Sequence, residues 1–80
     1  MHPINDPRQI GATLVGRRKH LKLSQTDVAA RLGLSQNRLS ELESSPQSLT
    51  VEQLLALLNV LGLEMSLRER DAGGKPKVEW

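Results

Sequence analysis

The sequence predicts a mainly α fold, in which four helices are followed by one β-strand and a tail. Apolar residues recur at helical spacing through residues 10–61, and each such run follows a residue that can cap a helix. After Gly62 the spacing changes to alternation, which is typical of a half-buried strand. We therefore divide the chain into a helical domain at 1–62, a strand at 63–70 and a tail at 71–80.

Length and composition restrict how this fold can be stabilised. The 80 residues allow one domain with a small core, and the absence of Cys excludes disulfides. The apolar content is mostly Leu, and Trp80 is the one aromatic residue. A small core without aromatic side chains makes stabilisation by oligomerisation a reasonable expectation.

Each predicted helix begins at a residue whose side chain can accept hydrogen bonds from free backbone amides: Asp6, Ser24, Ser35 and Thr50. Pro7 follows the first cap, and the first helix runs to about Leu21. Asp27 and Gln53 complete capping boxes for the second and fourth helices. Residues 44–48 form a loop, and Gly62 ends the fourth helix.

Residues 25–44 have the spacing of a helix-turn-helix. Ala29 is small where two helices must cross closely, and Gly33 stands where the turn needs a positive φ. The apolar positions that would hold this pair on a third helix are Val28, Leu32, Leu34, Leu39 and Leu42. The positions left facing outward are Ser35, Gln36, Asn37, Arg38, Ser40 and Glu41. Gln and Asn are unusual on a merely solvated face, and they can pair with adenine edges in the major groove.

Basic charge is concentrated in the half of the chain that contains this motif. The net charge is +2, but residues 8–42 carry seven Lys and Arg against two acidic residues. Residues 43–80 carry four basic and six acidic residues. This distribution is expected for phosphate binding, although a solvated basic face would explain the charge equally well.

The alternation after Gly62 predicts a strand whose partner comes from a second copy. Leu63, Met65 and Leu67 alternate with Glu64, Ser66 and Arg68. A lone strand leaves its backbone groups unpaired, so we expect antiparallel pairing in a homodimer about an axis near Ser66. Glu64 would then face Arg68 of the other chain. The alternative is that the fourth helix, apolar on more than one side, extends through residue 69.

Several functions are not indicated by the sequence. It has no catalytic Ser/His/Asp or Cys/His set and no phosphate loop, so we do not expect an enzyme. Neither His2 nor His20 has a partner at ligand spacing, and no metal or other cofactor is predicted. We find no signal peptide or membrane span, and we expect a cytoplasmic protein that is nucleoid-associated when bound to DNA. The Gly-Gly and Pro of residues 71–80 predict a flexible tail.

Residues 8–61 resemble the Xre/Cro-like helix-turn-helix family, which has a lambda-repressor-like fold. The positions that carry this resemblance are Gln25, Ala29, Gly33, Leu39, Leu42 and Glu43. The whole chain also resembles HipB-like antitoxins, the partners of HipA-like serine/threonine kinase toxins. This second resemblance rests on LESSPQSLT, the Leu-rich fourth helix, LEMSL and the terminal Glu79-Trp80. Asn37 and Glu41 depart from the subgroup pattern, so no operator sequence can be carried over.

The resemblance, together with the positions of the residues, implies roles for individual side chains. The third helix would enter the major groove and contact bases through Ser35, Gln36, Asn37 and Ser40. The phosphate contacts would be Gln25, at a helix N-terminus, together with Arg17, Lys19 and Arg38. Arg18 and Glu43 would form an internal ion pair. Val78 and Trp80 are costly to leave in water, so they either anchor a partner, which would be the toxin, or stand at the end of the chain by chance.

Three functions follow as hypotheses. The first is a dimeric repressor of a palindromic operator in double-stranded DNA that is also an antitoxin, binds a HipA-like kinase toxin and autoregulates its operon. The second is a stand-alone Xre-type regulator with no toxin partner. The third is a protein-interaction module that has lost DNA binding, against which Gln25, Gln36 and the basic first half argue.

Overall fold

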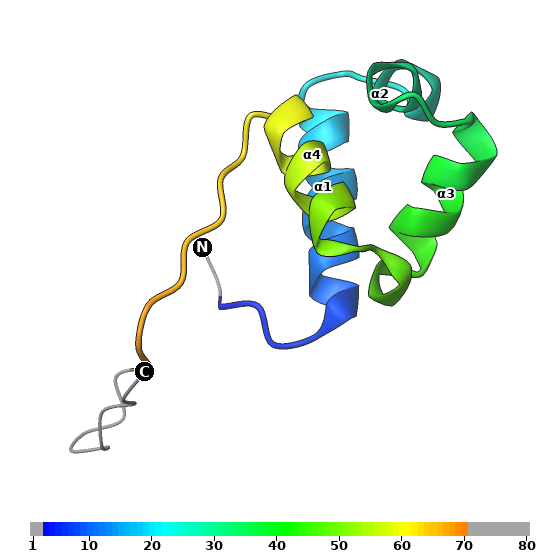
Figure 1. Cartoon of the computed structure of the whole chain (residues 1–80). Helices are drawn as coiled ribbons and strands as arrows, with labels where there is room; N and C mark the ends of the chain where they lie inside the picture. Colours follow the sequence, from blue (N-terminus) through cyan, green and yellow to red (C-terminus); the bar gives the residue numbers. More distant parts are fainter. Residues whose placement is uncertain (1–2, 71–80) are drawn as a thin grey trace.

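A computed structural model describes residues 3–70, which contain four α-helices and one short 3-10 helix. The α-helices are α1 (Pro7–His20), α2 (Gln25–Leu32), α3 (Gln36–Ser44) and α4 (Val51–Val60). In the view of Figure 1, α4 lies in front of α1, and α2 and α3 lie to the right of them; α3 packs against α1 and α2, and α4 packs against α2. The mainly α, four-helix prediction is confirmed.

The helix starts lie where the capping residues predicted them. Asp6, Ser24 and Thr50 each form a capping box, in which the side chain of the third helical residue bonds back to the cap. The Ser35 side chain accepts a hydrogen bond from the backbone amide of Arg38. The predicted helix ends are also present, since Gly33 has a φ of 69° and Gly62 a φ of 68°. Local sequence therefore determines most of the helix boundaries.

The core is built almost entirely from aliphatic side chains of all four helices and the residue after α4. Its members are at most 1% exposed: Leu14, Val28, Ala29, Leu39, Leu57 and Leu61. Leu42 is also fully buried, and Leu32 and Leu34 are half-buried against the cluster. The apolar positions predicted to hold the helix-turn-helix are thus confirmed. These apolar residues bury one side of α3 and leave its other side exposed.

The segment between α3 and α4 is more ordered than the predicted loop. Pro46–Ser48 forms the 3-10 helix η1, and Pro46 is buried. Gly11 of α1 lies against this turn, so closely that a Cβ there would be 2.6 Å from Cγ of Pro46. The same Cβ would be 2.8 Å from the backbone oxygen of Glu43. This close approach ties α1 to the end of α3.

Residues 63–70 do not form the predicted strand in the single chain. No strand is assigned anywhere in residues 3–70, because a strand is defined by hydrogen bonds to a neighbour and one chain offers none here. The segment leaves α4 as an extended chain (Figure 1), which rules out the alternative of a helix continuing to residue 69. Leu63 is half-buried, whereas Met65 and Leu67 are 47% and 92% exposed. The dimeric pairing stays a prediction.

Two further sequence predictions have different outcomes. The tail at 71–80, with Val78 and Trp80, lies outside the described residues. Within residues 3–70, no helix combines the length and apolar character needed to cross a bilayer.

Candidate nucleic-acid interface

The outer face of α3 is polar and accessible. Gln36, Asn37 and Arg38 are exposed, Ser40 is half-buried, and Leu39 on the opposite side is 0% exposed. Since its apolar side is fixed in the core, α3 presents this polar face in a defined orientation. This is the arrangement that a helix needs to insert side chains into a major groove.

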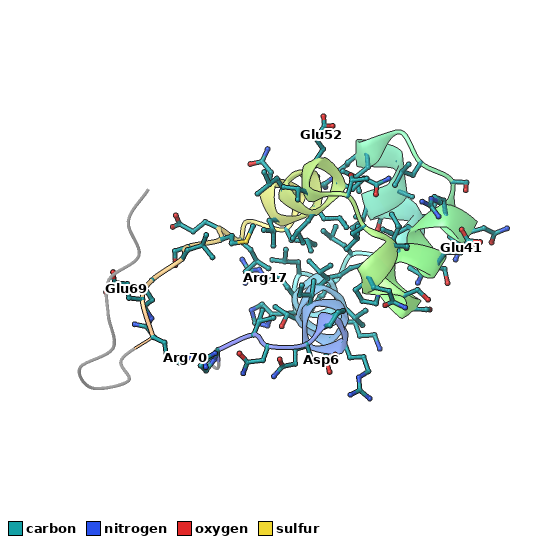
Figure 2. All side chains as sticks on the ribbon, turned by 60° about the horizontal axis from the view of Figure 1, so that its bottom comes forward. Asp6, Arg17, Glu41, Glu52, Glu69 and Arg70 are labelled. Carbon is teal, nitrogen blue, oxygen red and sulfur yellow. The ribbon has the colours of Figure 1, made fainter. Side chains whose placement is uncertain are left out.

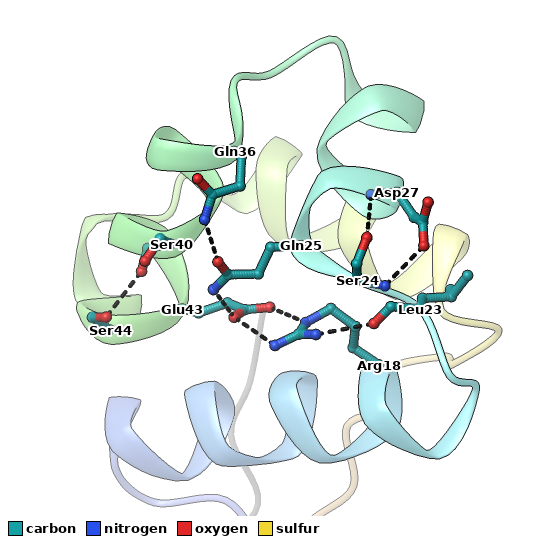
Figure 3. A network of polar contacts seen from close by, with 9 residues as sticks. All are labelled: Arg18, Leu23, Ser24, Gln25, Asp27, Gln36, Ser40, Glu43 and Ser44. Atoms are coloured by element: carbon teal, nitrogen blue, oxygen red, sulfur yellow. Dashed lines mark hydrogen bonds and ion pairs between the residues drawn. The ribbon is translucent and has the colours of Figure 1, made fainter.

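The side chain of Gln36 is held by a second glutamine. Its Nε2 donates to Oε1 of Gln25, and Nε2 of Gln25 donates to Oε1 of Glu43 over 2.9 Å. Figure 3 shows the three side chains in a continuous row from the start of α3 to its end. One Nε2 hydrogen and the Oε1 atom of Gln36 are left for an external partner. One donor and one acceptor at that spacing match N7 and the N6 amino group of adenine.

The row continues into a buried ion pair. Nε of Arg18 lies 2.8 Å from Oε2 of Glu43, and its Nη2 lies 3.3 Å from Oε1. Nη1 donates to the backbone oxygen of Leu23 over 3.0 Å. The side chains of Arg18 and Glu43 are only 11% and 6% exposed. The two side chains therefore form the ion pair that the resemblance led us to expect (Figure 3). Removal of one partner would destabilise the fold by about 3–5 kcal/mol.

The residues predicted to bind phosphate have different surroundings. Nε2 of Gln25 uses one hydrogen on Glu43 and keeps the other, so a phosphate at this position can accept from that hydrogen and from backbone amides of α2. Arg38 pairs with Glu41 of its own helix at 3.2 Å, with both side chains substantially exposed. Such a surface pair contributes at most about 1 kcal/mol, so a phosphate can replace Glu41 as the partner of Arg38. Lys19 is exposed in the last turn of α1.

Arg17 makes a contact that the sequence did not indicate. Its Nε donates to the backbone oxygen of Leu61 over 2.9 Å, at the C-terminal end of α4. Figure 2 shows Arg17 toward the C-terminal segment, with Glu41 on the far side of the molecule. The positive guanidinium stabilises the helix end through both charge and hydrogen bonding. This contact gives no support to the predicted phosphate role of Arg17.

The Ser35 hydroxyl is also partly occupied, because its oxygen caps α3 by accepting from the Arg38 amide over 3.1 Å. A base or phosphate contact by Ser35 would therefore use the hydroxyl hydrogen as a donor. Ser40 lies one turn after Gln36 on the outer face, as predicted. Among residues 3–70, no three side chains of the metal-binding types come together.

Sequence reasoning missed the connection between the two glutamines. Gln25 and Gln36 each occupy the first position of a helix, and the turn at Gly33 brings these two helix starts together. The pairing of two amides at equivalent helix positions is the signal that could have indicated the contact. It also missed the close approach of Gly11 to η1, for which only the glycine itself gave a hint.

Comparison with known proteins assigns the family. The HTH_3 model, described as helix-turn-helix, matches residues 17–67 of the chain. The chain belongs to this helix-turn-helix family. The match includes the whole of α2, α3 and α4, and therefore the polar face and the Gln25–Gln36 contact.

One protein with a similar sequence comes from a bacteriophage. The "ImmF control region 10 kDa protein" of Bacillus phage phi105 is 33% identical over an alignment of 58 residues, and the alignment covers 69% of this chain. Those residues span 64% of the phage protein, so about a third of that protein has no counterpart in the alignment.

Proposed function

We propose that the chain is a dimeric, sequence-specific transcriptional repressor that binds a palindromic operator through α3. The observation that carries this proposal is the Gln36 amide, which is exposed on the polar face and already oriented by Gln25. An oriented amide loses less conformational freedom when it pairs with a base than a free one does. A side chain needed only for solubility would gain nothing from such support.

The remaining contacts follow from positions on α3. Asn37 lies next to Gln36 and is exposed, so it is the second base-reading side chain. Ser40 reaches a base or a thymine methyl group one turn later. Lys19 and Arg38 neutralise phosphates, which contributes affinity and salt dependence without sequence preference. Each bidentate base contact discriminates by about 1–3 kcal/mol.

The dimer provides the second α3. Two recognition helices related by a two-fold axis enter successive major grooves about 34–36 Å apart, which requires a palindromic site. Apolar side chains remain exposed on α4 and the segment after it: Val51 at 70%, Leu55 at 49%, Met65 at 47% and Leu67 at 92%. Burial of this surface against a second copy removes it from water. Pairing of residues 63–70 about Ser66, with Glu64 facing Arg68, would complete the interface.

Selection from a library of random DNA duplexes tests the proposal. We expect the wild-type chain to enrich a palindrome and Gln36→Ala to lose the preference at one base pair in each half-site. Met65→Asp places a charge in the proposed interface, so we expect monomers with much weaker binding and an unchanged helical fold. Enrichment of no sequence, or normal dimers and normal binding by Met65→Asp, would contradict the corresponding part of the proposal.

The finer form of the proposal makes this repressor an antitoxin that binds a HipA-like kinase toxin and represses the shared operon. It rests on the resemblance to HipB-like antitoxins in the loop, α4, LEMSL and Glu79-Trp80. The alternative, a stand-alone Xre-type regulator, is favoured by the similarity to a phage protein named for a control region. Both forms act in the cytoplasm and associate with the nucleoid through DNA.

Co-purification separates the two forms. The full chain is expressed with the protein encoded beside it, and a tag on one of them recovers the complex. A stable complex with a kinase-like neighbour supports the antitoxin, and its loss on deletion of Val78 to Trp80 assigns the contact to the tail. Operator binding without any such complex supports the stand-alone regulator.

A further inference from the structure

We infer that Glu43 controls which base Gln36 recognises, because it fixes the orientation of both glutamine amides. The inference rests on the proposed DNA binding and adds Glu43 and Gln25 as positioning residues, neither of which needs to touch a base. The buried Arg18–Glu43 pair would then determine specificity in addition to joining α1 to α3. The orientations follow from which groups can donate and which can accept hydrogen bonds.

The hydrogen-bonded row of Arg18, Glu43, Gln25 and Gln36 begins with one group that can only donate and one that can only accept. An Arg guanidinium only donates hydrogen bonds, and it faces both oxygens of Glu43, which therefore act as acceptors. Gln25 lies against one of these oxygens over 2.9 Å. Only its NH2 group can face an acceptor, so the Gln25 amide has a single permitted orientation.

That orientation is passed on to the recognition helix. With its NH2 group on Glu43, Gln25 presents Oε1 to Gln36. Oε1 only accepts, so Gln36 must turn its own NH2 group inward. The atoms left facing outward are one N–H and the Oε1 of Gln36. This donor–acceptor pair suits adenine, whereas guanine presents two acceptors, N7 and O6, in the major groove.

Burial makes the orientation hard to reverse. Glu43 is 6% exposed at its side chain and Gln25 is half-buried, so water has little access to replace these bonds. A reversed Gln25 amide would place its oxygen against a carboxylate oxygen and leave a buried acceptor without a donor. The exposed Gln36, by contrast, would rotate freely if Gln25 did not bond to it.

The Glu43→Gln variant keeps the shape of the side chain but removes the fixed acceptor that orients Gln25. An amide at position 43 can offer either a donor or an acceptor, so Gln25 and Gln36 can each adopt both orientations. When reversed, Gln36 presents two N–H donors outward, which suits guanine. We expect the adenine preference at this base pair to fall about tenfold, with guanine as the base that gains.

The Gln25→Met variant tests the same row without disturbing the ion pair. Methionine fills similar space but neither orients Gln36 nor leaves Arg18 without its partner. We again expect an approximately tenfold fall in preference at the base pair of Gln36. At other base pairs we expect less than about a twofold change, since their contacts are untouched. Arg38→Ala is the matched control, because loss of a phosphate contact weakens binding to all sequences alike.

The experiment applies the random duplex library to the full wild-type chain and to Gln36→Ala, Gln25→Met, Glu43→Gln and Arg38→Ala. Gln36→Ala identifies the base pair, and thermal unfolding confirms that each variant folds. A purely structural role for the row predicts uniformly weaker binding in Gln25→Met with all preferences retained, and this result would overturn the inference. If Glu43→Gln does not fold, Gln25→Met decides the question.

A measurement without DNA separates this inference from the proposed function. The side-chain NH2 signals of Gln36 in the NMR spectrum should shift in Gln25→Met and lose the large separation of a bonded and a free hydrogen. Unchanged signals would show that the row does not hold Gln36, whatever the protein binds. Shifted signals together with no sequence selection by the wild-type chain would refute the proposed function, and the specificity inference with it.

Discussion

Two glycines of α1 should respond in opposite ways to the same substitution. A Cβ at Gly11 would lie 2.6 Å from Cγ of Pro46 and 2.8 Å from the backbone oxygen of Glu43. A Cβ at Gly16 would meet nothing within 4 Å. Both residues are inside the same helix, so the change in helix propensity on substitution by Ala is similar at the two positions.

The magnitudes follow from these contacts. Replacing a helical Gly by Ala stabilises the helix by about 1 kcal/mol, and we expect this full gain for Gly16→Ala. Gly11→Ala has the same gain but forces apart a buried proline ring and a backbone oxygen, neither of which is a flexible side-chain end. Overpacking of this kind costs about 1–3 kcal/mol, so the net effect is a loss of up to about 2 kcal/mol. In a domain of this size, 1 kcal/mol corresponds to about 4–8 °C in Tm.

Thermal and urea unfolding followed by circular dichroism measure both changes. We expect the Tm of Gly16→Ala to rise and that of Gly11→Ala to fall. Equal increases in the two variants would show that α1 does not approach η1 as described, and the reasoning from close contact would be refuted.

Two other variants test single contacts. Arg17→Ala should lower the free energy of unfolding by about 1 kcal/mol, because the bond to Leu61 is lost. The slope of the logarithm of DNA affinity against the logarithm of salt concentration should not change. A slope reduced by about one would instead support a phosphate contact by Arg17. The pKa of Asp27 lies below its ordinary value chiefly because the backbone N–H of Ser24 donates a hydrogen bond to its carboxylate. The contribution of the Asp27 carboxylate to stability is therefore present above about pH 4 and is lost as the pH falls through its pKa in the folded state. Between pH 5 and pH 2, the free energy of unfolding should therefore change less in Asp27→Asn than in the wild-type chain.

The helix boundaries were accessible from the sequence because capping is local. The boxes at Asp6, Ser24 and Thr50 each involve residues three positions apart, and the sequence shows both partners of each box together. The core residues could be predicted for a similar reason, because helical periodicity indicates which side of each helix is apolar. The positive φ of Gly33 followed from its place in the turn.

The details of the interface depend on contacts that no local pattern contains. Gln25 bonds to Glu43 across 18 positions, and Arg17 bonds to Leu61 across 44. The basic character of Arg17 predicted a phosphate contact, which stays a prediction, but its bond to the end of α4 joins residues too far apart in the chain for a local pattern to show. No strand is assigned at 63–70, because the described residues offer this segment no neighbouring strand, and pairing with a second copy stays a prediction.

Glu43 takes part both in the packing against α1 and in the proposed base recognition, so the Gly11 variant has a second expected effect. The backbone oxygen of Glu43 lies against Gly11, while its carboxylate orients Gln25. A methyl group at Gly11 would therefore displace the end of α3 that carries the first acceptor of the row. We expect Gly11→Ala to move the Gln36 side-chain NMR signals in the direction expected for Gln25→Met, and Gly16→Ala to leave them in place. If Gly11→Ala lowers Tm without moving these signals, the row tolerates displacement of α3 and packing acts on stability alone.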